Sequence, residues 1–215
     1  MTKNNVNYAK IMQKQLESLA KDTKPRLLLH VCCGPCLTVP YQEIADYFDV
    51  TIYYENSNIY PKAEYDRRLS ELQRYILENN YKIEVIAPRY DNEKFNIDLE
   101  PYKDLPEGFK RCHICFEKRL TSLFKFAQEN GYEYCASSLT ISRYKNAQIV
   151  NQIGSDLEQK FPPIKWLYSD FKKQGGYEKS LLICREYDLY FQEYCGCKYS
   201  YKKWQEKLNN KQKND

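Results

Sequence analysis

One short stretch, residues 27–36 (LLLHVCCGPC), most constrains the fold of this chain. Its first half is an apolar run that is too short for a buried helix and is typical of a strand covered on both faces of a parallel sheet. The run stops at Gly34-Pro35, and residues 36–48 (CLTVPYQEIADYF) have the pattern of a helix. Three cysteines therefore lie at a turn from strand to helix, where backbone N–H groups favour thiolates and where open α/β sheets bind ligands.

The rest of the chain repeats this alternation of strand and helix. Further strands are predicted at residues 50–54, 82–87, 132–136 and 164–168, and further helices at residues 61–78, 111–130 and 147–159 and around Leu181. This spacing predicts an α/β fold, a doubly wound parallel sheet of about five strands. Residues 91–110 carry two prolines and a glycine and are predicted to form a long irregular loop, which is usually a lid or a binding loop.

The helix predicted at residues 61–78 is amphipathic. Its periodicity places charged side chains outside and apolar ones inside: Asp66, Arg67, Arg68 and Glu71 outside, and Leu69, Leu72 and Ile76 inside.

Three parts of the chain differ in composition. Residues 1–24 are interpreted as an N-terminal helical extension, residues 25–200 as the α/β catalytic domain with every cysteine, and residues 201–215 as a lysine-rich tail that continues a basic C-terminal helix. From Lys198 onward the chain has six lysines against two acidic residues, which accounts for the whole formal net charge of +4. Such a tail is either a handle for a phosphate backbone or a solvated helix with a frayed end.

The chain has nine cysteines in 215 residues. Their role depends on whether the compartment of the protein is oxidising or reducing. The chain has no apolar segment long enough for a membrane span and no secretory signal, so we expect a cytoplasmic protein without membrane contact. Disulfides do not persist as structural links there, so the cysteines indicate metal binding or redox catalysis. Cys135 and Cys184 stand alone in apolar segments and are predicted to be small buried hydrophobic residues.

Three kinds of site could use the two C-x-x-C pairs. A thioredoxin-like dithiol would use Cys33 and Cys36, but it leaves Cys32 and the second pair unexplained. A zinc site could take two thiolates from each pair. A 4Fe-4S cluster also needs four thiolates, and it accounts for more of the sequence: Cys32 and Cys33 at the turn, with Cys112 and Cys115 one helical turn apart.

Two further features add redox chemistry and a proton donor. Cys195 and Cys197 are separated by one glycine, and a disulfide across so short a ring would be strained and easily reduced; the alternative is a turn with two incidental thiols. The two histidines of the chain, His30 and His113, both lie within cysteine motifs. His30 is a candidate catalytic proton donor, with a buried hydrogen-bonding role as the alternative.

Polar residues follow the predicted strands at the edge of the sheet where such folds bind ligands. Each motif alone is more often an ordinary capped loop, but their shared location favours substrate binding. The candidate substrate-binding residues are Asn58, Glu64, Arg67, Ser138, Arg143, Lys145 and Lys172.

Six motifs in order, between residues 27 and 200, carry a resemblance to a known family: LLLHVCCGPC, ENSNIYPKAEYDRR, KRCHICFEKRL, SSLTISRYKN, DFKKQGGYEKS and EYCGCKYS. Together they resemble the epoxyqueuosine reductases of the QueH type. The resemblance implies a nucleotide-binding, HUP-like α/β fold and a cytoplasmic oxidoreductase. It also implies the reaction, which is reduction of epoxyqueuosine to queuosine at the tRNA wobble position, the last step of queuosine biosynthesis.

Carried over to this sequence, the resemblance implies a 4Fe-4S cluster and a redox-active disulfide. The cluster ligands would be Cys32, Cys33, Cys112 and Cys115, and the disulfide would join Cys195 and Cys197. The resemblance also leaves room for an additional iron, for which Cys36, His30 and Asp170 are the candidate ligands. The expected partners are tRNA with epoxyqueuosine in its anticodon and an external electron donor.

Overall fold

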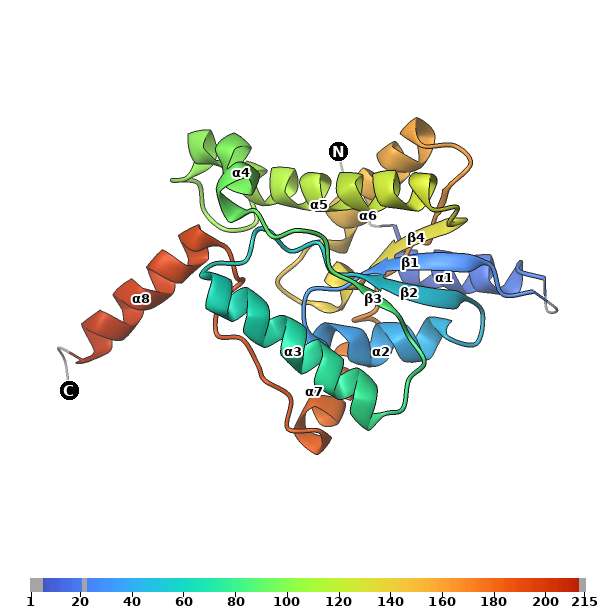
Figure 1. The fold of residues 1–215 in the computed structure, drawn as a ribbon, viewed down its shortest axis with the longest axis horizontal. Helices are drawn as coiled ribbons and strands as arrows, with labels where there is room; N and C mark the ends of the chain where they lie inside the picture. The colour runs from blue at the N-terminus through green and yellow to red at the C-terminus, as the bar shows by residue number, and fades with distance from the viewer. Residues whose placement is uncertain (1–5, 21–22, 213–215) are drawn as a thin grey trace.

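The computed structural model describes residues 6–20 and 23–212. Its centre is a five-stranded, all-parallel sheet (Figure 1) in the order β3 (Val85–Ile86), β2 (Asp49–Tyr53), β1 (Arg26–His30), β4 (Tyr134–Ser137) and β5 (Lys165–Trp166). The apolar run at the start of the cysteine motif is the middle strand, and His30 pairs with Tyr53 on one side and Ser137 on the other. The predicted α/β class and the parallel sheet of five strands are confirmed.

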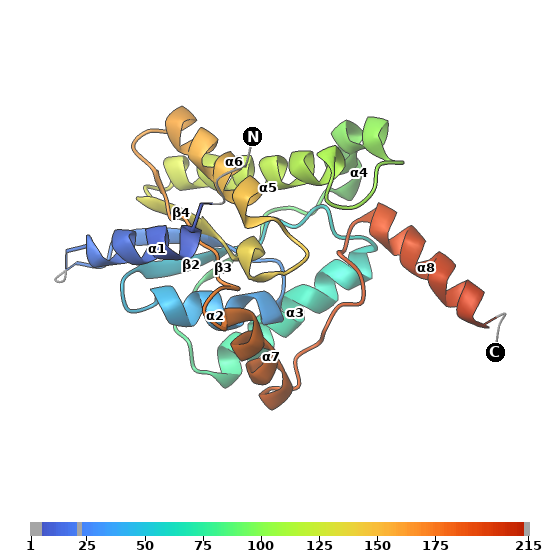
Figure 2. The same ribbon diagram turned by 180° about the vertical axis from the view of Figure 1, so that it is seen from behind.

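Helices cover both faces of the sheet. One face is covered by α5 (Lys110–Glu129) and α6 (Ala147–Lys160), and the other by α2 (Gly34–Ile44), α3 (Lys62–Glu78) and α7 (Gly176–Glu186), as Figures 1 and 2 show. The side chains of β1 alternate between these layers. Leu28 packs in the core with α5 and α6, whereas Leu27 and Leu29 pack in the core with α2, α3 and α7. β1 is thus buried on both faces, which explains its continuous apolar sequence.

The strand order reverses between β1 and β4. The chain goes from β1 outward to β2 and β3, and then returns through α5 to place β4 on the other side of β1. In open α/β sheets the loops after the two strands at such a point separate and leave a crevice. The cysteine turn follows β1, and the polar segment with the 3-10 helix η2 (Ser138–Ile141) follows β4, so both lie at this switch point of the sheet.

The edge strands and the long loop differ from their predictions. β3 and β5 are two residues long, because each pairs on one side only and only with the end of its neighbour. Residues 91–110, predicted to be irregular, contain the short helix α4 (Asn92–Asn96) and the 3-10 helix η1 (Ile97–Tyr102). Asp91 caps α4 through its side chain, a local signal that the proline content of the segment obscured.

Arg68 was predicted to lie on the outer face of its helix, and this is wrong. Its side chain is 1% exposed, because it forms an ion pair with Glu64 and donates to the carbonyl oxygens of Tyr194 and Cys195. Cys135 and Cys184 are buried, as predicted.

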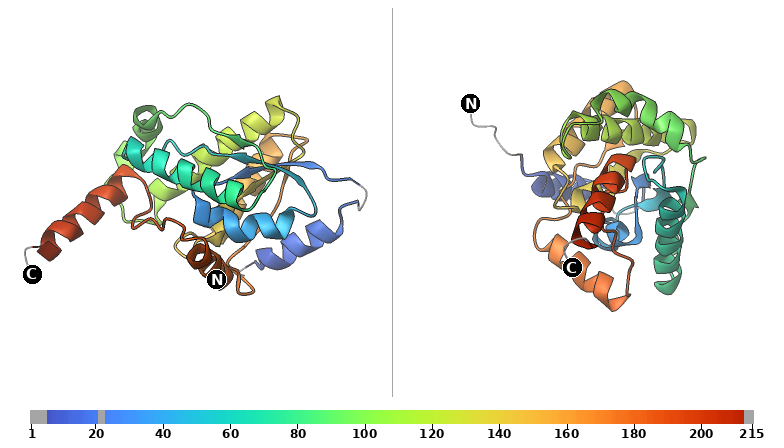
Figure 3. Two further views of the ribbon diagram at one scale, coloured as in Figure 1. Left: turned by 60° about the horizontal axis from the view of Figure 1, so that its bottom comes forward. Right: turned by 90° about the vertical axis from the view of Figure 1, so that its left-hand side faces the viewer.

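The two ends of the described chain behave differently. Helix α1 (Tyr8–Glu17) packs on the body, where Met12 and Leu16 join the core and Tyr8 stacks on Tyr168. Helix α8 (Lys198–Gln212) projects from the body (Figure 3). The three-part division of the chain stays an interpretation. None of the helices in the described part has the length and apolar composition needed to cross a membrane.

Candidate functional site

Three thiols meet where β1 ends and α2 begins. The Sγ atom of Cys32 lies 3.4 Å from that of Cys36 and 3.8 Å from that of Cys33, and all three sulfurs lie within 4.8 Å of one another. Cys33 is the N-cap of α2 with an extended backbone, and Pro35 occupies the first turn. The chain therefore turns between the cysteines, so side chains that would alternate across a strand converge on one buried point.

The three thiols of this group do not ionise equally. Hydrogen bonds with Cys33 and Cys36 lower the pKa of Cys32 well below its usual value, and the charges of Lys145 and Arg119 act in the same direction. Burial raises the pKa of Cys33 to about 12, and the contact with Cys32 adds to this. Cys32 is therefore the thiol of the group that ionises most readily, and any further negative charge there needs a cation or a metal to balance it.

Cys112 and Cys115 lie on the first turns of α5, three residues apart and on the same side of the helix. Gly108 donates its N–H to the Cys112 sulfur at 3.2 Å, and burial, followed by the neighbouring thiols of Cys197 and Cys112, raises the pKa of Cys115 to about 12. Among the described residues, the group of ligand atoms that all lie within 4.8 Å of one another contains only the sulfurs of Cys32, Cys33 and Cys36. The two α5 thiols are not part of that group.

Cys195 and Cys197 approach from the segment before α8. Burial raises the pKa of Cys195 to about 12, and the thiols of Cys197 and Cys115 contribute, so Cys195 lies near Cys115 of α5. Both thiols are free in this structure. The redox-active disulfide therefore stays a prediction.

The charge of Arg119 interacts with thiols of all three cysteine motifs. Arg119 was not among the site residues predicted from the sequence. It lies on α5, is 3% exposed, donates to the Oδ1 atom of Asn56 at 2.6 Å, and pairs with no carboxylate in the described part of the chain. Burial lowers its pKa, but the thiols of Cys115, Cys32 and Cys195 outweigh this and raise it. Its position four residues after Cys115, on the same helical face, was the available signal.

His30 is fully buried between β2, β4 and α5 rather than open to a substrate. Its Nδ1 atom lies 3.1 Å from the Ser137 hydroxyl, and Arg119 donates its Nε–H to the Nε2 atom of His30 at 3.2 Å. Burial and the Arg119 charge lower the pKa of His30 to about 3. The imidazole is neutral at neutral pH, which supports the hydrogen-bonding role over the proton-donor role; the catalytic role stays a prediction.

The candidate ligands of an additional iron are dispersed. Cys36 lies beside Cys32 and Cys33. His30 forms hydrogen bonds with Ser137 and Arg119, and Asp170 pairs with Lys172.

The predicted substrate-binding residues fall into three groups. In the first group, Glu64 pairs with Arg68 at 2.7 Å and accepts a hydrogen bond from the Tyr190 hydroxyl at 3.0 Å. The Arg67 guanidinium lies over the Tyr190 ring, 3.5 Å from its centroid. Glu64 and Arg67 therefore both support the segment that leads to Cys195. Three of the four cations among them, Arg143, Lys145 and Lys172, line one pocket. The other two, Asn58 and Ser138, each have a buried side-chain oxygen without a hydrogen-bond partner among the described residues.

Comparisons with known proteins agree on one family. The family model of epoxyqueuosine reductase QueH matches residues 27–203. A protein named epoxyqueuosine reductase QueH from Streptococcus pyogenes is 40% identical over 202 residues, which cover 92% of this chain and 79% of the relative. Proteins of the same name from Staphylococcus epidermidis and Thermotoga maritima are 39% and 31% identical, over 92% and 81% of this chain and 85% and 89% of their own.

A solved structure supports the fold. The U34-tRNA thiolase NcsA from Methanococcus maripaludis, determined with its [4Fe-4S] cluster, superposes with a TM-score of 0.50 at 14% sequence identity, over 90% of this chain and 68% of the thiolase. At this identity the likeness concerns the fold alone.

Proposed function

The chain belongs to the family of epoxyqueuosine reductases called QueH, and we propose that it reduces the epoxide of epoxyqueuosine to queuosine at the tRNA wobble position with a [4Fe-4S] cluster. One observation in the structure carries the proposal beyond family membership. Thiols from three motifs that are distant in sequence lie near the buried guanidinium of Arg119. Within the described part of the chain, no carboxylate neutralises this guanidinium.

The residues present fit such a cluster. An unpaired buried charge costs several kcal/mol unless a negative partner compensates it. A cluster held by thiolates supplies that negative charge next to Arg119, and soft thiolate ligands suit iron-sulfur chemistry. Zinc would accept the same thiolates, and a thioredoxin-like dithiol would need only one pair. Family membership favours the cluster over both alternatives.

The proposed ligands are Cys32, Cys33, Cys112 and Cys115. Cys36 is the alternative fourth ligand, because its sulfur lies 3.4 Å from that of Cys32. The iron content of single variants separates the two ligand sets.

The reaction removes the epoxide oxygen as water and leaves an alkene, so it consumes two electrons and two protons. The cluster, when bound, supplies electrons one at a time. Oxidation of the thiols of Cys195 and Cys197 to a disulfide releases two electrons and two protons, which matches the stoichiometry. An external donor must then reduce this disulfide to restore the pair.

Positive side chains of this chain stabilise the departing oxygen. Negative charge develops on the epoxide oxygen as its carbon–oxygen bonds break, and fixed cations in a water-poor site stabilise such charge. Arg119 and Lys145 both face the thiols. The proposed tRNA substrate supports the cytoplasm as the proposed location.

Purification without oxygen tests the proposal. The protein is expected to be brown, to absorb broadly in the visible, to contain about four irons per chain, and to convert epoxyqueuosine in tRNA when a reductant is supplied. A colourless protein with one zinc and no turnover would contradict the proposal.

A further inference from the structure

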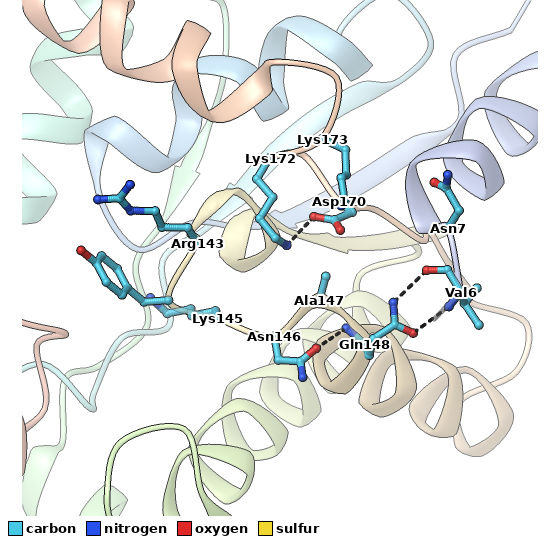
Figure 4. A pocket seen from close by; sticks show the side chains of 11 residues that line it. Val6, Asn7, Arg143, Lys145, Asn146, Ala147, Gln148, Asp170, Lys172 and Lys173 are labelled. Atoms are coloured by element: carbon cyan, nitrogen blue, oxygen red, sulfur yellow. Dashed lines mark hydrogen bonds and ion pairs between the residues drawn. The ribbon is translucent and has the colours of Figure 1, made fainter. Parts of the chain in front are cut away.

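A basic pocket lies at the carboxyl edge of the sheet, next to the cysteine centre. It has a volume of about 490 Å³. We define it by its four cations and one carboxylate: Arg143, Lys145, Lys172, Lys173 and Asp170. Figure 4 shows Arg143 and Lys145 on one side, with Lys172, Lys173 and Asp170 on the other. Asp170 pairs with Lys172 and Lys145 interacts with the thiols, so the charges of Arg143 and Lys173 are left for a ligand.

The pocket is built from the loops after β4 and β5, where the start of α6 contributes to the lining. The side chain of Asn146 caps α6 by accepting the backbone N–H of Gln148. The side-chain amide of Gln148 in turn donates to the carbonyl oxygen of Val6 and accepts the backbone N–H of Val6. The positive end of a 14-residue helix therefore adds to the field of the cations. Charges of this sign and a helix N-terminus together favour an anion, and phosphate in particular.

An aromatic surface lies at the same pocket. Tyr144 lines it and is 76% exposed, and the Arg143 guanidinium lies 5.0 Å from the ring centroid of Tyr177. An exposed tyrosine beside a phosphate-binding group is suited to unpaired nucleotides, whose bases stack on aromatic rings.

Lys145 connects the pocket to the cysteine centre. It lines the pocket, and its charge also interacts with the thiols of Cys195, Cys32 and Cys36. A phosphate in the pocket and the thiols would therefore share Lys145 as a neighbour. The cysteine turn follows β1 and Lys145 lies in the segment after β4, and these two strands are neighbours in the sheet.

We propose that the basic pocket binds a backbone phosphate of the tRNA anticodon loop beside the wobble nucleotide, with Tyr144 as a stacking surface for a neighbouring base. This inference rests on the proposed function, because it assigns a role to the pocket in holding that substrate. A free nucleotide or pyrophosphate carries the same phosphate chemistry, and the experiment separates these sources.

The first measurement is the affinity for an unmodified anticodon stem-loop RNA at several salt concentrations. The double variant Arg143→Gln/Lys173→Gln removes two exposed pocket cations and leaves Lys145 in place. Its Kd is expected to rise about tenfold or more, and the slope of log Kd against log salt to fall by about 0.7 for each phosphate that is no longer neutralised. Lys125→Gln, which removes an exposed lysine on α5 outside the pocket, should leave both quantities unchanged.

The second measurement locates the phosphate. Stem-loops with a single neutral methylphosphonate are compared, and one replacement next to the wobble nucleotide should weaken wild-type binding about tenfold. The same replacement should have no further effect on the double variant. RNA affinity and salt slope equal to those of the wild type in the double variant would overturn the inference. A second result would also overturn the inference: the wild type binds pyrophosphate or ATP, and the double variant loses this binding but keeps its RNA affinity. That result would assign the pocket to a free nucleotide.

Iron content and turnover of the wild-type protein are measured in parallel, so the two proposals can fail separately. If the wild type reduces epoxyqueuosine and the pocket variants bind RNA normally, the pocket assignment fails and the function stands. If the wild type lacks iron and turnover but the pocket variants lose RNA affinity, the function fails and the phosphate assignment stands.

Discussion

Arg68 donates a hydrogen bond from its Nη1 atom to the carbonyl oxygen of Cys195 at 3.3 Å, across 127 positions of sequence. The same guanidinium binds the Tyr194 carbonyl at 3.2 Å and pairs with Glu64 at 2.7 Å. The Tyr60 N–H also donates to the carbonyl oxygen of Gly196 at 2.7 Å. Helix α3 and the loop before it therefore hold the segment that carries Cys195 and Cys197 against the body.

Arg68→Met is expected to destabilise the protein and release this segment. Removal of one partner of a buried ion pair costs about 3 kcal/mol or more, because the Glu64 carboxylate is left buried without its cation. Denaturant unfolding measures the loss, and the rate at which a thiol reagent labels Cys195 and Cys197 should increase. Gln73→Met changes an exposed residue of α3 that has no printed contact with this segment and is the control. Equal unfolding free energies for the two variants would contradict the role of Arg68.

Arg119→Met is expected to make the cluster harder to reduce. A cation beside the centre stabilises the more negative, reduced state, so its removal should lower the midpoint potential by on the order of 60 mV, which is about 1.4 kcal/mol for one electron. Arg119→Lys keeps the charge and should keep most of the potential. A redox titration followed by visible absorbance makes the measurement. A potential unchanged in Arg119→Met would show that the guanidinium serves packing alone.

The thiols are expected to separate into ligands and a redox pair. Cys112→Ala and Cys115→Ala should lose cluster iron and turnover together, because an iron without its thiolate is readily shed. Cys195→Ala should keep most of the iron and lose turnover. Cys36→Ala should also keep its iron if the proposed ligand set is correct; iron loss in this variant would instead assign Cys36 as a ligand.

A buried cysteine outside the centre provides the control for these variants. Cys184 packs in the core and is free. Cys184→Ala should retain both iron and turnover. Equal iron loss in Cys112→Ala and Cys195→Ala would contradict the division of roles.

Removal of α8 beyond Trp204 is expected to weaken tRNA binding without affecting the cluster. This truncation keeps the stacking of Trp204 on Tyr194 and removes Lys207 and Lys211, which are exposed and project from the body. The apparent KM for tRNA should rise several-fold, and its salt dependence should flatten because fewer phosphates are neutralised. Steady-state kinetics at two salt concentrations check this. An unchanged KM and slope would identify the tail as a solvated helix.

Local patterns in the sequence determined the elements and the place of the first thiols. An apolar run, a Gly-Pro turn and a helical periodicity are properties of neighbouring residues, so the turn that holds Cys32 and Cys33 could be predicted. The alternation of strands and helices likewise predicted the parallel sheet. The six motifs supplied the family. The helical spacing that places Arg119 beside Cys115 was also readable, although nothing in the sequence gives a reason to expect a buried cation there.

Only the tertiary structure decided which side chains meet at the crevice. Helical periodicity placed Arg68 outside, but carbonyl oxygens from the segment before α8 satisfy its guanidinium and make its burial favourable. Glu64 is the counter-charge of Arg68 for the same reason, and its role in substrate binding stays a prediction. Arg143 and Lys172 come from two different loops and share one pocket because parallel strands end at one edge. The burial and charge of a side chain depend on partners that the packing supplies, and sequence periodicity carries no information about those partners.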